Sequence, residues 1–460
     1  MLYSELKYAM FSFILIIILI LSSYISMHIF LNTLLVLSVI LLVFQIILYK
    51  SVLNKKFSIF VFYLISLYIF SFGQLYTSYT IYADDFNFEY TKFTSSTVIN
   101  GFVYVFCFIS ISFFPALRGK KEKIIMCDAN NTIINKVYAF LLLLFGLPFL
   151  LYQVYVKTTV MLESGYGTNL QLISGPVSLF SLFTYVGLFL IYYSYSNKYI
   201  KFTSLLLFIF LAIISMAGGN RSVGLVPLLF SMYMIYFDSK KFIFKKILYL
   251  GIILYCALVA LYIVTSVRGD KYNYSDITLS AVTAINPYKY SINLLYELGG
   301  TISNTFKVLD EIDIYFMPGY GKSYLFSVFG PIPNINGVLD FARNEVTYVK
   351  KFKSSKFAGG SCIAESFYNF KWLALVVAYF LAKLVTKISI LYEVWLKKGK
   401  YIQTSMLVIP TFSIIWLPRD YFTSIFTSGI FSVVILIFFY NITKRLLSVS
   451  LYKTSFPNNI

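Results

Sequence analysis

The sequence predicts an all-α protein that crosses a membrane many times and carries one long loop on the outer side. Apolar residues make up 59% of its 460 residues and charged residues only 12%, whereas soluble domains are about 25% charged. The mean hydropathy is +0.78, and apolar runs of about 20 residues, the length that crosses a bilayer, recur along the chain. This composition excludes an ordinary soluble enzyme, and 47 Phe and 41 Tyr exclude a disordered chain.

About twelve apolar runs are expected to span the membrane. They lie near residues 8–26, 29–49, 57–82, 97–117, 133–156, 173–196, 202–217, 223–237, 247–266, 370–392, 402–417 and 422–442. The first run is followed after a short turn by a second full-length run, and no small-residue cleavage site closes it. We therefore expect a membrane span there rather than a cleaved signal peptide.

Basic residues predict the orientation of these spans. They gather in alternate connections, at Lys50/Lys55/Lys56, Arg118/Lys120/Lys121/Lys123, Lys198/Lys201, Lys240/Lys241/Lys245/Lys246 and Lys397/Lys398/Lys400. Because Lys and Arg are enriched in cytoplasmic loops, both termini are expected in the cytoplasm. Membrane topology then explains most of the net charge of +19, and no nucleic-acid partner is needed.

One long outer loop interrupts the series of short connections. It covers residues 268–370 and separates spans 1–9 in residues 1–267 from spans 10–12 and the tail in residues 371–460. Its charge density is far above that of the remaining chain, and loops of this length are usually functional. Apolar residues recur in it at three- and four-residue spacing, at Ile292, Leu295, Leu298, Ile302, Phe306 and Leu309. This pattern predicts amphipathic helices that lie at the membrane surface.

Arginine is rare and unevenly placed. The chain has six Arg against 32 Lys, and four of the six fall on the predicted outer side, at Arg221, Arg268, Arg343 and Arg419. The guanidinium group offers a bidentate fork that matches phosphate and carboxylate, which Lys cannot provide. A cluster of such groups at the membrane surface is suited to a lipid-linked phosphate or pyrophosphate. The alternative is that arginines at span ends simply extend toward the interface.

Each arginine also has a local context. Arg221 follows Gly219 and Asn220 in a glycine turn between two apolar runs, where backbone can approach a ligand closely. Arg268 lies directly after the ninth run, two residues before Asp270. Arg419 is followed by Asp420, and a simple ion pair between these two at the surface is the alternative to anion binding. Arg343 is the first residue of a basic run with Lys350, Lys351, Lys353 and Lys356. For this run, a face exposed to solvent is at least as good an explanation as anion binding.

A carboxylate on the predicted outer side is a second candidate for the chemistry of the protein. Glu365 lies just before the tenth run, where a membrane-proximal carboxyl group can be tuned for proton transfer. Alternatively, it is a helix-start Glu favoured by the helix dipole. Four scattered cysteines and the single His28 predict no disulfide framework, no metal site and no cofactor.

Three segments together resemble the Wzy family of O-antigen polysaccharide polymerases. Gly218–Ser222 resembles the family's glycine-arginine turn, and Pro318–Tyr324, with Tyr320 and Lys322, is similar to its Gly-x-Ser-Tyr stretch. Gly359–Phe370, which contains Glu365, resembles its motif before a late span. Two departures are the absent Arg-x10-Gly pattern and Lys371, which stands where Gly is common after the Asn-Phe pair.

The resemblance implies a helical fold like that of the C-type glycosyltransferases, in the bacterial inner membrane with the active site facing the periplasm. The implied reaction transfers a growing glycan from undecaprenyl pyrophosphate to the terminal sugar of a new lipid-linked repeat unit. Arg221, Arg268 and Arg419 are then expected to stabilise the leaving group, and Glu365 or Asp270 to accept the proton, without a metal ion. A chain-length regulator protein is a possible partner.

Two other functions stay open on the sequence. A glycosyltransferase that uses a polyprenyl-phosphate sugar would place an acidic base in an early outer loop, where Asp84 and Asp85 lie. A flippase or secondary transporter would require charges within the spans and often an internal repeat, whereas charges within the predicted spans are few and no repeat is visible. An O-antigen ligase is disfavoured because that related family uses an outer-loop His, whereas His28 lies in a short turn between the first two runs.

Overall fold

The computed structural model of the chain is helical throughout the part that it describes. That part comprises residues 2–53, 58–118, 132–164, 175–217, 221–237, 255, 286–312, 317–332, 334, 337–348 and 360–454. By contacts between residues the chain forms two compact units. Unit 1 contains residues 1–123, 291–391 and 413–427, and unit 2 contains residues 124–290, 392–412 and 428–460.

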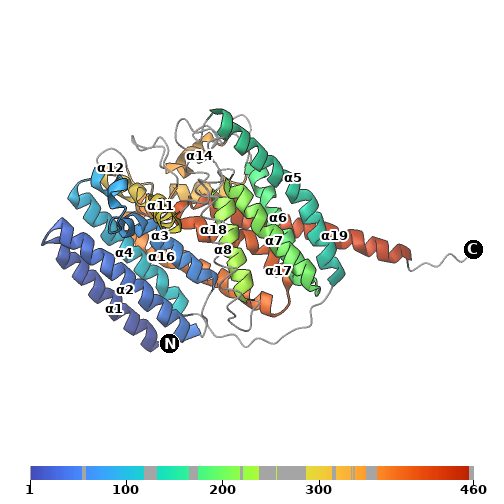
Figure 1. The fold of residues 1–460 in the computed structure, drawn as a ribbon, viewed down its shortest axis with the longest axis horizontal. Helices are drawn as coiled ribbons and strands as arrows, with labels where there is room; N and C mark the ends of the chain where they lie inside the picture. The colour runs from blue at the N-terminus through green and yellow to red at the C-terminus, as the bar shows by residue number, and fades with distance from the viewer. Residues whose placement is uncertain are drawn as a thin grey trace, which may run out of the picture. The chain divides into compact units, whose positions relative to one another are not determined.

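Four long helices form one side of unit 1. They are α1 (Leu2–Ser23), α2 (Met27–Leu53), α3 (Ile59–Thr77) and α4 (Ser95–Leu117), which run side by side in blue to cyan (Figure 1). A buried polar chain joins all four: Tyr8 Oη donates to the Ser110 carbonyl at 2.8 Å, Gln45 Nε2 donates to Tyr8 Oη at 2.7 Å, and Tyr68 Oη donates to Gln45 Oε1 at 2.9 Å. Such interhelical hydrogen bonds stabilise helix packing in a membrane.

The segment that follows the ninth predicted span supplies shorter helices to unit 1. They are α11 (Pro287–Gly299), α12 (Ile302–Glu311), α13 (Lys322–Phe326), α14 (Asp340–Val346) and α15 (Cys362–Phe370). Alongside them lie the 3₁₀ turns η1 (Ala83–Asp85), η2 (Glu89–Lys92), η5 (Ser327–Phe329), η8 (Lys371–Leu373) and η9 (Leu417–Arg419). The amphipathic pattern is confirmed over α11 and α12, because Ile292, Leu298, Ile302 and Phe306 are buried.

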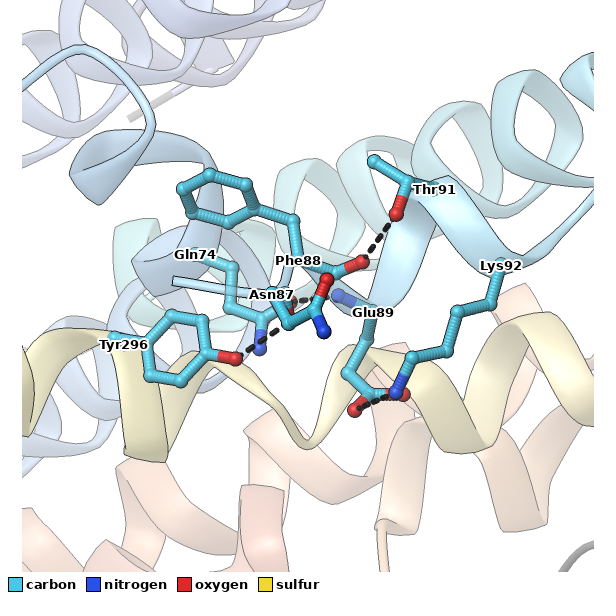
Figure 2. Close-up of polar contacts among 7 residues, drawn as sticks. All are labelled: Gln74, Asn87, Phe88, Glu89, Thr91, Lys92 and Tyr296. Carbon is cyan, nitrogen blue, oxygen red and sulfur yellow. Dashed lines mark hydrogen bonds and ion pairs between the residues drawn. The ribbon is translucent and has the colours of Figure 1, made fainter. Parts of the chain in front are cut away.

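Backbone contact fixes α11 against α3. A Cβ atom on Gly73 of α3 would clash with the Leu295 carbonyl, and one on Gly299 of α11 would clash with the backbone nitrogen of Gln74. Figure 2 shows the polar contacts beside this crossing: the Glu89 N–H donates to Gln74 Oε1 at 2.9 Å, and Tyr296 Oη donates to the Asn87 carbonyl at 2.5 Å. The early outer segment is therefore anchored to the long loop.

Unit 2 holds the remaining long helices. They are α5 (Thr132–Ser164), α6 (Gly175–Ser194), α7 (Lys198–Ala217), α8 (Arg221–Phe237), the short α17 (Tyr401–Met406), the start of α18 (Val408–Trp416) and α19 (Phe431–Thr454), which follows the π-helical η10 (Ile425–Ile430). Glycines let these helices pack closely. A Cβ on Gly146 of α5 would lie 2.5 Å from the Thr184 nitrogen of α6, and one on Gly224 of α8 would lie 2.6 Å from the Ala212 carbonyl of α7.

The predicted spans agree with the helices in ten places. Ten helices of the described residues are long and apolar enough to cross a membrane, with α16 (Ala374–Lys397) continuing from α15 in the eighth of them. The expected span at 223–237 is represented by a shorter apolar helix, Gly224–Tyr236. The expected span at 247–266 lies outside the described residues. The third predicted run extended too far, since α3 ends at Thr77, where Ser78 begins a polar connection.

Candidate functional site

Glu365 lies on α15, the short first helix of the candidate span Cys362–Lys397. Ser361 caps this helix, α15, by accepting a hydrogen bond from the Ala364 N–H at 3.4 Å, and a Glu in the first turn complements the helix dipole. The helix ends at Lys371, whose φ of 48° lies in the left-handed region. α16 begins three residues later and continues the same candidate span, so Glu365 lies in the first turn of this span, whereas the sequence predicted it just before the span.

Both oxygens of the Glu365 carboxylate are engaged. Ser323 Oγ donates to Oε1 at 2.5 Å, and the Phe422 backbone N–H donates to Oε2 at 2.7 Å. The Asn369 amide donates to Ser323 Oγ at 2.7 Å and to the Glu365 carbonyl at 2.8 Å. Glu365 itself is 0% exposed. One buried carboxylate thus ties α15 to α13 and to the segment after η9, through hydrogen bonds of the strong charge-assisted kind.

A glycine turn delivers Ser323 to this carboxylate. Tyr320 and Gly321 have φ values of 47° and 79°, a left-handed pair that only Gly adopts without cost. The Gly319 N–H donates to the Tyr368 carbonyl at 2.9 Å, and a Cβ on Gly319 would lie 2.5 Å from the Tyr368 ring. The glycines of Pro318–Tyr324 therefore allow a close approach to α15.

Tyrosines enclose the carboxylate. Tyr324 Oη is hydrogen-bonded to Ser366 Oγ at 2.7 Å, and its ring meets that of Phe422 edge-on at 4.4 Å. Tyr348 Oη donates to the Ser361 carbonyl at 3.1 Å, and the Tyr348 ring stacks on Tyr368 at 5.4 Å. Burial, and then the Glu365 charge, raises the pKa of both Tyr324 and Tyr348 well above the usual value. Their hydroxyl groups remain protonated at neutral pH.

The end of η9 and the residue after it bring a cation and a second carboxylate to the segment that binds Glu365. The Arg419 guanidinium carbon lies 6.0 Å from the Phe70 ring centroid and 5.8 Å from that of Trp416, within the range of cation–π attraction. Asp420 is partly buried, and its Oδ1 accepts the Tyr421 N–H at 2.8 Å. Burial raises the pKa of the Asp420 carboxyl to about 6. No ion pair joins Asp420 to Arg419 or to any other described residue, so the expected surface pair is absent.

Gly360 brings this segment close to α15. A Cβ on Gly360 would lie 2.6 Å from the Tyr421 nitrogen and 2.8 Å from the Asp420 carbonyl carbon. The backbone of the segment before α15 and that of residues 420–421 are therefore in direct contact. Together with the Phe422 hydrogen bond, this contact sets the position of the Arg419–Asp420 pair relative to Glu365.

The other candidate site residues from the sequence do not all lie close to Glu365 in the described part of the chain. Tyr320 is 71% exposed, and Lys322 and Arg343 are exposed on α13 and α14. Arg221 is the first residue of α8 in unit 2, and its side chain lies outside the description. Gly219, Asn220, Arg268 and Asp270 lie outside the described residues.

Three partners of Glu365 and the second carboxylate were not identified as site residues from the sequence. Ser323 lies in Pro318–Tyr324 and Asn369 in Gly359–Phe370, two of the segments that resemble the family. Their place in these segments could have marked them as site residues. The Phe422 contribution is a backbone N–H, for which the sequence carries no signal. Asp420 was interpreted as an ion-pair partner. Among the described residues, no group of three or more His, Cys, Asp or Glu side chains is arranged to hold a metal ion.

The connection between α3 and α4 carries a second polar cluster. Lys92 pairs with Glu89 at 2.7 Å (Figure 2), and Asp84 is exposed on η1. In this cluster the Gln74 side chain accepts a hydrogen bond from the Glu89 N–H, and the Tyr296 hydroxyl donates one to the Asn87 carbonyl. This cluster anchors the loop, and the acidic pair of the alternative glycosyltransferase hypothesis lies at its exposed edge.

Comparison with known proteins gives one match. The family model described as O-antigen polysaccharide polymerase Wzy matches residues 8–447. In the comparisons with curated proteins and with solved structures, nothing matches. The match covers nearly the whole chain, including every segment of the Glu365 cluster.

Proposed function

We propose how this chain, which belongs to the O-antigen polysaccharide polymerase Wzy family, carries out its reaction. Proteins of this family polymerise lipid-linked repeat units, and the chain is a multi-pass membrane glycosyltransferase of polysaccharide biosynthesis. The donor is the growing glycan on undecaprenyl pyrophosphate, and the acceptor is the terminal sugar of a new lipid-linked unit. The flippase and polyprenyl-phosphate alternatives have no comparable support.

The site for this reaction lies around Glu365. The observation that carries the proposal is the buried carboxylate, whose hydrogen bonds hold the Arg419–Asp420 turn against the segment that bears Lys322. Glycosyl transfer from a pyrophosphate needs cations where negative charge develops on the leaving group. Arg419 supplies one, and its guanidinium lies beside two aromatic rings.

The sequence offers further cations and polar groups for pyrophosphate binding. They are Arg221, Arg268, Arg343 and Lys322, with Tyr320 and the Gly219–Asn220 turn. Glu365 is an essential site carboxylate, and Asp270 is the carboxylate that the sequence offered as an alternative proton acceptor. Because arginines stabilise the leaving group in this scheme, the reaction proceeds without a metal ion. A chain-length regulator is the proposed protein partner, and the fold is of the C-type glycosyltransferase kind.

The orientation follows from the basic loops. Glu365 begins one candidate span and Arg419 ends the next, and the turn between these spans carries Lys397, Lys398 and Lys400. Since basic loops face the cytoplasm, we place Glu365 and Arg419 on the periplasmic side and both termini in the cytoplasm. An impermeant thiol reagent added from the periplasm should label Ser354→Cys and not Ser239→Cys. The reversed pattern would contradict this orientation.

A deletion strain tests the proposed function in cells. Without the polymerase, the surface glycan should carry a single repeat unit, and the ladder of longer chains on a silver-stained gel should disappear. Complementation with the intact gene should restore the ladder. Loss of all surface glycan, including the single unit, would instead indicate a flippase or a ligase.

A further inference from the structure

The Glu365 carboxylate is closed off from a substrate by burial and by the groups that it binds. Oε1 and Oε2 each accept a short hydrogen bond, from Ser323 Oγ and from the Phe422 N–H, and the residue is 0% exposed. A general base must come within hydrogen-bond reach of the proton that it removes. To reach a sugar hydroxyl, Glu365 would have to give up a buried bond and open the packed tyrosines around it.

Asp420 meets the requirements that Glu365 does not. It is partly exposed, directly follows Arg419, and makes no ion pair with a described residue that would keep its charge occupied. Its Oδ1 accepts the Tyr421 N–H, and the Ser424 hydroxyl is a second neighbour that favours the ionised carboxylate. The next N–H along, that of Phe422, is the one held by Glu365. A single turn therefore carries both a cation and a carboxylate. Glu365 holds this turn in place through its hydrogen bond with the Phe422 N–H.

We infer that Asp420 is the catalytic base and that Glu365 is a positioning residue acting through the Phe422 N–H. The inference rests on the proposed function. In the step, the acceptor hydroxyl gives its proton to an Asp420 carboxylate oxygen, and the acceptor oxygen forms a bond to the anomeric carbon of the donor. The bond from that carbon to the pyrophosphate oxygen breaks, and its electron pair leaves on undecaprenyl pyrophosphate beside Arg419.

The protonation behaviour of Asp420 agrees with this role. Burial raises its pKa to about 6, so the group is mostly ionised at neutral pH yet more basic than an ordinary Asp, as a general base should be. The titratable groups of the described residues that act on it or respond to it are Glu365 and Cys362 on α15 and Tyr421, and the charged neighbour in sequence is Arg419. The rate should therefore fall as the pH drops through about 6, because Asp420 takes up a proton.

Kinetics of the full-length protein in nanodiscs with lipid-linked repeat units test the inference. Asp420→Asn should lower kcat by about 10²–10⁴-fold with KM little changed, and it should remove the acid limb of the pH–rate profile. Glu365→Gln keeps an acceptor for the Phe422 N–H, so it should lower kcat less and keep the acid limb. Asp84→Asn, which neutralises an exposed carboxylate elsewhere on unit 1, should behave as wild type.

The opposite pattern would overturn the assignment. If Glu365→Gln removes the acid limb while Asp420→Asn keeps it, Glu365 is the base. If Asp420→Asn does not fold, Asp420→Glu decides, since it should retain activity with a shifted acid limb, and an unshifted limb would contradict the inference. Failure of wild type to lengthen the lipid-linked units would count against the proposed function itself, whereas an active wild type with an unaffected Asp420→Asn would refute only this inference.

Discussion

Glu365→Ala is expected to eliminate long-chain polymer. The substitution leaves Ser323 Oγ and the Phe422 N–H without the carboxylate that they bind. A buried polar group left unpaired costs about 1–3 kcal/mol, a large share of the roughly 5–15 kcal/mol by which domains are stable. The turn that bears Arg419 and Asp420 should then lose its fixed position. The glycan ladder of a strain carrying the variant measures the result.

Two variants separate a local effect from general loss of protein. Glu365→Gln retains two polar atoms at the same place and should keep part of the activity. Asp84→Ala removes an exposed carboxylate from η1 and should leave the ladder unchanged. Membrane levels of all three proteins should be compared on the same blot. A normal ladder from Glu365→Ala at normal protein level would show that the carboxylate is dispensable.

Arg419→Lys is expected to lower polymerisation by about 10²–10³-fold, the loss typical when one charge-stabilising donor is removed. Lysine keeps the charge but loses the planar fork that binds phosphate in a bidentate manner and stacks on aromatic rings. In this protein the guanidinium lies near the Phe70 and Trp416 rings, so the replacement loses that contact as well. Turnover of lipid-linked repeat units by the purified variant measures the effect.

Arg445→Lys is the matched control. Arg445 is exposed on α19, and the same change there should leave turnover unaffected. If Arg419→Lys also retained normal turnover, Arg419 would be a cation that only extends toward the membrane surface, which is the alternative that the sequence left open.

Most of the helical architecture could be predicted from the sequence because hydrophobic length alone identifies a membrane span. The places where prediction failed have local causes. The run at 57–82 continues in apolar and aromatic residues beyond Thr77, but the chain turns at Ser78. The run at 223–237 does form a helix, α8 (Arg221–Phe237), whose apolar part Gly224–Tyr236 is shorter than the other candidate spans. Periodicity likewise predicted α11 and α12, although not their junction at Gly299 and Gly300.

The candidate site was less accessible to sequence analysis. Glu365 could be singled out because a carboxylate beside a span is unusual, but its partners come from positions 42 and 57 residues away, and one of them is a backbone N–H. The ion pair expected between Arg419 and Asp420 does not form, because Arg419 lies over aromatic rings and Asp420 accepts a backbone N–H. Tertiary contacts of this kind leave no pattern in the local sequence.

Reconstitution with a defined substrate tests the central claim most directly. Purified protein in liposomes is supplied with undecaprenyl-pyrophosphate-linked repeat units in the presence of a metal chelator, and the products are separated by length. The account predicts a ladder of products that increase by one repeat unit, at a rate unaffected by the chelator and strongly reduced by Asp420→Asn. Products that never exceed one unit, or a ladder that requires added metal, would contradict it.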